Sequence, residues 1–230
     1  MTRFRPRRFA GTFAGALGAC ALAFAALATS RPASAGDLSP PVAAVRDRWA
    51  VVNYDLPKPQ REAAFEALSR QAAAARTAQP KDAGALIWEG IVLSSFAGER
   101  GGLGALKLAK AAKADFEQAI RLAPGALDGS AYVSLAVLYH QVPGWPLGFG
   151  DDDKAQDLFN DGLQASPDGI DANYFYGQYL LDKGDWKRAA TALQKAIDAP
   201  ARPGRERADQ GRRREAAALL ARARDKLAAR

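Results

Sequence analysis

Apolar residues recur every three or four positions along most of the chain after residue 40, which is the period of one face of an α-helix. This spacing predicts a first helix over 41–54 and a second over 60–78, which ends before Pro80. The apolar face of the first helix consists of Val42, Val45, Trp49 and Val52. No strand-like alternation of any length occurs, so the pattern predicts an all-α fold.

A second pattern repeats three times further along the chain. Small residues flank a Phe or Leu at offsets of four and three residues, and a proline follows shortly afterwards. The copies are Ala112, Phe116, Ala119 and Pro124; Ala155, Phe159, Gly162 and Pro167; and Ala189, Leu193, Ala196 and Pro200. Small residues let two helices approach closely, and the proline ends the second helix. We therefore predict three helix-pair repeats over approximately 83–124, 128–167 and 170–200, with capping helices over 41–78 and 205–229.

The repeated spacing matches the second half of the tetratricopeptide pattern, and the chain resembles that family. Three short segments resemble a more particular group of secreted bacterial proteins, which includes the T component associated with tripartite ATP-independent periplasmic (TRAP) transporters. They are 146–151 (PLGFGD), 171–176 (DANYFY) and 202–206 (RPGRE). The resemblance implies a tetratricopeptide-like α-solenoid with a ligand-sized channel or groove, which works beside a solute-binding protein.

Two segments are longer than the repeat pattern requires. A glycine-rich stretch at 99–104 predicts a flexible break between two helices. A turn-rich stretch at 141–150 carries Trp145, Leu147 and Phe149. Apolar residues in such a loop either fold back on the helices or meet a partner. We expect this loop to pack on the helical body, with Trp145 as a lid or wall of the groove.

The first helix of each pair lines the concave face of such a solenoid, and Gly90, Ala136 and Gly177 set its register. Steps of one, four and five residues from these positions give the candidate groove residues. With the loop aromatics, the predicted ligand- or partner-binding groove comprises Ser94, Ser95, His140, Gln141, Trp145, Phe149, Asp171, Tyr174, Gln178 and Asp182. This mixture of hydroxyl, amide, aromatic and carboxylate groups suits a small organic solute or a peptide.

The first 35 residues have a different composition from the rest of the chain. Four arginines precede an apolar stretch over 9–28, and residues 33–35 (ASA) have the small residues of a cleavage site. This layout is typical of a secretory signal peptide, so we expect residues 1–35 to be cleaved and a helical domain over 36–230 to reside in the periplasm. Two alternatives are an uncleaved membrane anchor and a lipoprotein, since residues 17–20 (LGAC) resemble a lipobox with Cys20 as its cysteine.

Removal of the leader changes the charge of the protein. Five of the 32 basic residues and none of the 25 acidic residues lie in the leader, so the net charge falls from +7 to +2. We therefore predict no nucleic-acid partner. Residues 200–230 remain locally basic, with ten Arg or Lys against four acids. We expect a solvated capping helix there; peripheral association with anionic lipid or an acidic partner is the alternative, and homo-oligomerisation is left open.

The sequence contains few groups suited to catalysis or metal binding. His140 is the only histidine and lacks the Ser/Asp or His-x-x-His companions of a catalytic or metal site. Asp151, Asp152 and Asp153 lack the glycine and distal glutamate of a calcium loop, and we expect Asp151 to cap a helix. We therefore predict that the protein is not an enzyme and uses no metal and no cofactor.

These patterns together predict a periplasmic binding or scaffold protein that holds a small solute or a partner protein in its concave groove. In the version that the resemblance implies, it is an accessory to a solute transporter. The alternative is a pure protein–protein adaptor in envelope assembly. A solute binder would enclose a pocket bounded by Trp145, Phe149 and Tyr174, whereas an adaptor would keep an open groove.

Overall fold

The computed structural model describes residues 38–229, so the predicted leader and Cys20 lie outside the described residues. Nine α-helices and no strand occur in that part of the chain, and the all-α prediction is confirmed. The helices are α1 (Pro40–Tyr54), α2 (Lys58–Ala78), α3 (Ala83–Arg100), α4 (Gly102–Leu122), α5 (Ser130–Gln141), α6 (Asp152–Ala165), α7 (Ile170–Asp182), α8 (Trp186–Asp198) and α9 (Glu206–Ala228).

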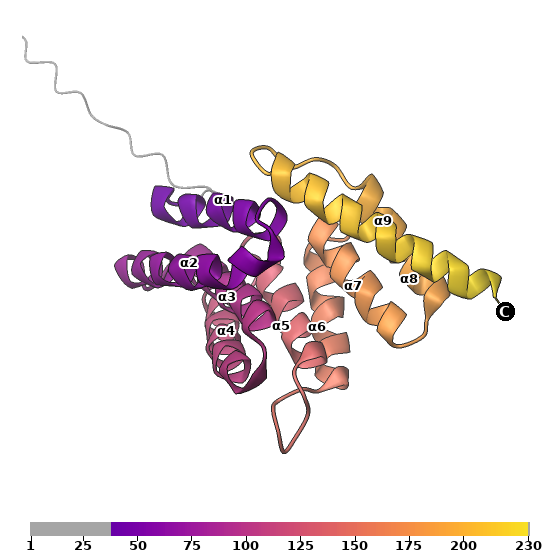
Figure 1. Ribbon diagram of the computed structural model, residues 1–230, viewed down its shortest axis with the longest axis horizontal. Coiled ribbons are helices and arrows are strands. Elements are labelled where there is room, and N and C mark those ends of the chain that lie inside the picture. Colours follow the sequence, from indigo (N-terminus) through magenta and orange to yellow (C-terminus); the bar gives the residue numbers. More distant parts are fainter. Residues whose placement is uncertain (1–37, 230) are drawn as a thin grey trace, which may run out of the picture. The chain divides into compact units, whose positions relative to one another are not determined.

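Consecutive helices pack against each other as pairs (Figure 1). The most extensive contacts join α3 with α4, α7 with α8, and α5 with α6, and α1 also packs on α2. The seams lie where the small residues recur. A Cβ atom on Gly90 would lie only 2.6 Å from Phe116 Cε1, and one on Gly177 would lie 2.6 Å from Leu193 Cγ. Glycine is therefore required for the close approach of these helices.

The glycine-rich stretch at 99–104 is not the flexible break that the sequence predicts. α3 continues to Arg100 and α4 begins at Gly102, so one residue separates them. Gly101 and Gly102 have φ of 66° and 60°, and this left-handed backbone makes the turn. The extra residues lengthen both helices, because apolar side chains such as the buried Phe96 continue the helical period to their ends.

The predicted solvated capping helix is wrong for the first half of α9. This helix packs along α8 and also contacts α7 and α1 (Figure 1). Asp209, Gly211 and Arg212 are buried there. A Cβ atom on Gly211 would overlap the ring of Tyr54 in α1, so the absence of a side chain allows the two helices to meet.

The aspartate cap at the start of α6 is confirmed. The backbone N–H of Lys154 donates to Asp151 Oδ1 at 3.1 Å, and Asp152 and Asp153 occupy the first turn of the helix. A carboxylate at this position satisfies a free N–H and interacts favourably with the helix dipole. None of the nine described helices is long and apolar enough to cross a membrane.

Candidate functional site

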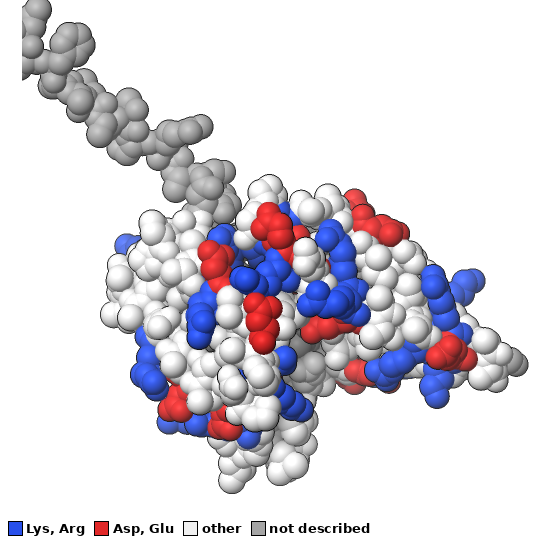
Figure 2. Space-filling model, turned by 45° about the horizontal axis from the view of Figure 1, so that its top comes forward, with Lys and Arg blue, Asp and Glu red and all other residues white. Residues whose placement is uncertain are grey.

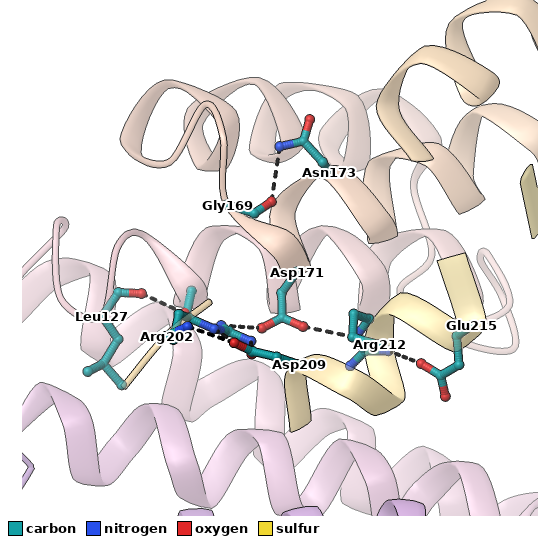
Figure 3. Close-up of polar contacts among 9 residues, drawn as sticks. Leu127, Gly169, Asp171, Asn173, Arg202, Asp209, Arg212 and Glu215 are labelled. Atoms are coloured by element: carbon teal, nitrogen blue, oxygen red, sulfur yellow. Dashed lines mark hydrogen bonds and ion pairs between the residues drawn. The ribbon is translucent and has the colours of Figure 1, made fainter. Parts of the chain in front are cut away.

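Charged side chains of both signs gather over α1 and the start of α9 (Figure 2). Asp171, near the start of α7, lies between two arginines (Figure 3). Its Oδ2 accepts a hydrogen bond from Arg202 Nη1 at 2.7 Å, and its Oδ1 accepts one from Arg212 Nε at 2.9 Å. Since Arg202 precedes α9 and Arg212 belongs to it, one carboxylate ties the last helix to α7.

Two further acids complete this cluster. Asp209, which is 1% exposed, accepts hydrogen bonds from the backbone N–H of Arg202 at 2.8 Å and from its Nε at 2.9 Å. Glu215 accepts one from Arg212 Nη1 at 2.7 Å. We call these five residues (Asp171, Arg202, Asp209, Arg212 and Glu215) the α9 lock. Each charge in the lock has a hydrogen-bonded counter-charge, and that pairing is what makes burial of charge tolerable.

The arginines of the lock also set the ionisation of its carboxylate. Burial alone would raise the pKa of Asp171, but the positive charges of Arg212 and Arg202 outweigh burial and hold that pKa well below its usual range. Burial likewise opposes the charge of Arg212, yet the negative groups around it raise its pKa. Asp171 and Arg212 are therefore both ionised at neutral pH, so the ion pair between them is present at that pH.

The lock covers two of the predicted groove residues. The guanidinium carbon of Arg212 lies 4.4 Å from the ring centroid of Tyr174 and 4.5 Å from that of Phe175. Tyr174 is buried beneath it. The structure thus brings Asp171 and Tyr174 together as predicted for one site, but α9 of the same chain occupies the space in front of them.

His140 and Asp182 also meet, at a second place. His140 Nδ1 lies 2.8 Å from Asp152 Oδ1, and its Nε2 lies 3.2 Å from Asp182 Oδ2. Lys183 Nζ donates to the other oxygen of Asp152 at 3.0 Å. A hollow of about 240 Å³ lies beside this cluster. It is lined by Tyr139, His140, Val142, Gly144, Gly150, Asp151 and Asp152.

The loop between α5 and α6 packs on the body at only one of its three apolar residues. Phe149 makes an edge-on contact with Tyr139, with ring centroids 5.6 Å apart. Trp145 is 90% exposed and Leu147 is 74% exposed. The prediction that Trp145 forms a lid or wall is therefore wrong. The physical reason is that Phe149 alone reaches the helices, while the turn at 144–148 carries the other two outwards.

The remaining predicted groove residues have separate environments. Ser95 Oγ accepts a hydrogen bond from Trp49 Nε1 at 2.8 Å, and Ser94 Oγ donates to the carbonyl of Gly90 in its own helix. Gln141 is exposed and Gln178 is half-buried. The ten predicted residues are thus divided among the α1–α3 contact, the His140 cluster, the loop and the α9 lock.

A third group of ionisable residues lies between α2, α3 and α4, and none of its members is among the predicted site residues. Asp115 in α4 is 9% exposed, and burial together with the nearby Glu89 raises its pKa to about 7. Burial also raises the pKa of Glu89, although Arg76 opposes the shift. Arg76 Nε lies 3.6 Å from Glu89 Oε2, and Arg76 Nη2 donates weakly to Gln118 at 3.4 Å. One arginine therefore faces two carboxyl groups.

The predicted site residues do not include Arg202, Asp209 or Arg212, although Arg202 lies in the 202–206 segment that carries the family resemblance. The contacts Arg202–Asp209 and Arg212–Asp171 span seven and 41 residues, and only the contact of Arg212 with Glu215 has the spacing of helical neighbours. The one available signal was Gly211, a glycine inside an otherwise good helix, which often marks a close contact. Within residues 38–229, no three His, Cys, Asp or Glu side chains form a group that could hold a metal ion.

Comparisons with known proteins leave the family of this chain open. No protein-family model matches it, and a search of curated proteins finds no significant relative. The case for a function therefore depends on the contacts and the exposed surfaces described above.

Proposed function

We propose that the protein is a tetratricopeptide-like helical-repeat module of the periplasm, and that its function is to bind a partner protein. The three helix pairs that cross at Gly90, at Gly177 and between α5 and α6 support the repeat architecture. The leader-like residues 1–35 support the location. Such repeats generally act as binding modules, whereas fold alone says nothing of the partner.

The observation that carries the proposal is the exposed tip of the loop over 142–150. Trp145 and Leu147 are large apolar residues that are 90% and 74% exposed. The loop is held in place, because the backbone N–H groups of Gly148 and Gly150 donate to carbonyls within it at 3.1 and 3.0 Å. An aromatic side chain presented on a fixed loop resembles the anchor residues that dominate protein interfaces.

The neighbouring helix indicates what kind of surface the partner presents. Asp153, Asp157 and Asp161 are exposed and lie four residues apart, so they form an acidic stripe along α6 directly after the loop. Lys154 is the only basic residue between 141 and 170. We infer a partner surface with an apolar pocket for Trp145 and Leu147 and with basic residues opposite α6.

Two steps test this function. A photo-crosslinking amino acid at Leu147 should capture one partner in the envelope, and the same group at Leu103, which is 92% exposed on α4, should not. With the captured protein purified, the double variant Trp145→Ala/Leu147→Ala should bind at least tenfold more weakly than the unaltered chain, and Leu103→Ala should bind normally. Equal binding by the double variant would refute the proposal.

Solute carriage, including the role beside a transporter that the resemblance implies, is the second candidate. The hollow of about 240 Å³ beside His140 supports it, although typical solute pockets are larger. The pocket expected from Trp145, Phe149 and Tyr174 is not formed, because Trp145 faces solvent and Tyr174 lies under α9. Native mass spectrometry of the protein from its own envelope would reveal a bound solute as a constant added mass.

A further inference from the structure

Arg205, the residue directly before α9, differs from the arginines around it. Arg202 and Arg212 each contact two carboxylates. Within residues 38–229, by contrast, no acidic side chain lies within ion-pair distance of Arg205. Its guanidinium instead lies over the ring of Trp88 in α3, with 5.4 Å between its carbon and the ring centroid. Its guanidinium therefore makes a ring contact and no ion pair within the described chain.

The surroundings of Arg205 favour an added negative charge. Burial and the positive charge of Arg202 lower the pKa of Arg205, even though Asp171 and Asp209 oppose this. Neither of those two acids forms an ion pair with Arg205, and their oxygens accept hydrogen bonds from Arg202 and Arg212 instead. An arginine kept partly from water and beside other arginines is a common arrangement for binding carboxylate or phosphate groups.

A buried donor in the residue beneath Arg205 also lacks a partner. Trp88, 3% exposed, has an indole N–H with no hydrogen-bond acceptor. Trp49 of α1 packs edge-on against Trp88, with ring centroids 6.0 Å apart. Buried polar atoms are rarely left unpaired in proteins, so this unpaired donor in the junction is informative.

The guanidinium of Arg205 and the indole of Trp88 can each donate a hydrogen bond, and neither can accept one. A ligand that satisfies them must supply acceptors and negative charge. We propose that the junction of α1, α3 and α9 binds a small oxyanion, a carboxylate or a phosphate group, which Arg205 holds through two parallel hydrogen bonds. This site is separate from the loop tip, so the anion-binding proposal does not depend on the proposed partner protein.

Tryptophan fluorescence and thermal unfolding of the purified protein test the site directly, because Trp88 lies against Arg205. The probes are succinate and inorganic phosphate, with succinamide as the neutral match for succinate. We expect a saturable change in emission and a rise in Tm with at least one of the two anions and neither effect with succinamide. Succinate alone would identify a carboxylate ligand, and phosphate alone a phosphate ligand.

Variants separate a binding role for Arg205 from a structural one. Arg205→Gln should weaken anion binding at least tenfold. Arg205→Lys should weaken it less, because lysine keeps the positive charge but cannot donate two parallel hydrogen bonds. Arg214→Gln, an exposed position on the same helix, should bind normally. Without ligand, Arg205→Gln should lower the Tm only slightly, because it loses the ring contact with Trp88 and the attraction to Asp171 and Asp209 but no ion pair. Undiminished binding by Arg205→Gln, binding of succinamide, or no binding of either anion would each overturn the proposal.

Discussion

Asp171 is half-buried and Asp115 is buried, and the protein shifts their pKa values in opposite directions. Asp171 receives hydrogen bonds from two arginines, and its pKa lies well below the usual range. Asp115 receives none from a charged group, lies near Glu89, and has a pKa of about 7. Burial raises the pKa in both cases, so the number of arginines that reach each carboxylate decides the outcome.

The two carboxylates therefore affect folding in opposite ways as the pH changes. The lowered pKa of Asp171 means that its stabilisation is present above about pH 4 and is lost as the pH falls further. The raised pKa of Asp115 means that the unfolded chain releases this proton first, so stability falls as the pH rises from about 4 to about 7. The α9 lock therefore stabilises the folded chain, whereas ionisation of Asp115 destabilises it as the pH rises.

Loss of an arginine from the lock should have the largest effect. Arg212→Met removes a buried charge from between Asp171 and Glu215 and leaves two carboxylates under-compensated. We expect the free energy of unfolding in urea to fall by about 2.5 kcal/mol at pH 7. This is below the cost of about 3–5 kcal/mol for a fully buried ion pair, because Asp171 and Glu215 are partly exposed and Arg202 still contacts Asp171. Arg214→Met, which alters an exposed arginine two positions away, should change stability by less than about 0.5 kcal/mol.

A loss of less than about 1 kcal/mol for Arg212→Met would contradict this account. It would mean that the contacts of α9 with α8 hold the helix without the lock. The same result would weaken the contrast with Asp115, because the two arginines would then be of little consequence for stability.

The cluster around Asp115 should respond in the opposite sense. Asp115→Asn keeps the shape of the side chain and cannot ionise, so we expect it to stabilise the protein by about 2 kcal/mol at pH 8, a discounted fraction of what a shift from 3.8 to about 7 would give. At pH 4 the two proteins should have nearly equal stability. Urea unfolding at the two pH values measures the difference, and Asp198→Asn, an exposed aspartate, is the control. A gain that does not depend on pH would show that ionisation of Asp115 is not the cause.

The helices could be predicted from the sequence because they depend on spacing within one segment. Phe116 and Leu193 are buried against the small residues that the repeat pattern identified, and Asp151 caps its helix. The lock could not be predicted in this way. Asp171 meets Arg212 across 41 positions, and apart from the neighbouring Gly211 nothing in the local sequence distinguishes Arg212 from the exposed Arg214.

Exposure of single loop residues was equally hard to predict. Trp145 and Phe149 have the same chemical character and lie in one loop, but only Phe149 reaches Tyr139. The direction of each side chain follows from the turn geometry of that loop, which composition does not specify. For this reason the predicted groove residues include some that the structure places at unrelated contacts.

Substitutions at two glycines test how far the lock depends on the packing of α9 against α1, and their expected effects are the smallest. Gly211→Ala adds a Cβ that overlaps the ring of Tyr54, so α9 must move away from α1. We expect a loss of about 1.5 kcal/mol in unfolding free energy, within the usual cost of overpacking. Gly98→Ala, in α3, meets no atom within 4 Å and should instead stabilise the protein by about 0.5 kcal/mol through helix propensity. If Gly211→Ala behaved like Gly98→Ala, the contact between α1 and α9 would be dispensable, and the lock would hold α9 to α7 alone.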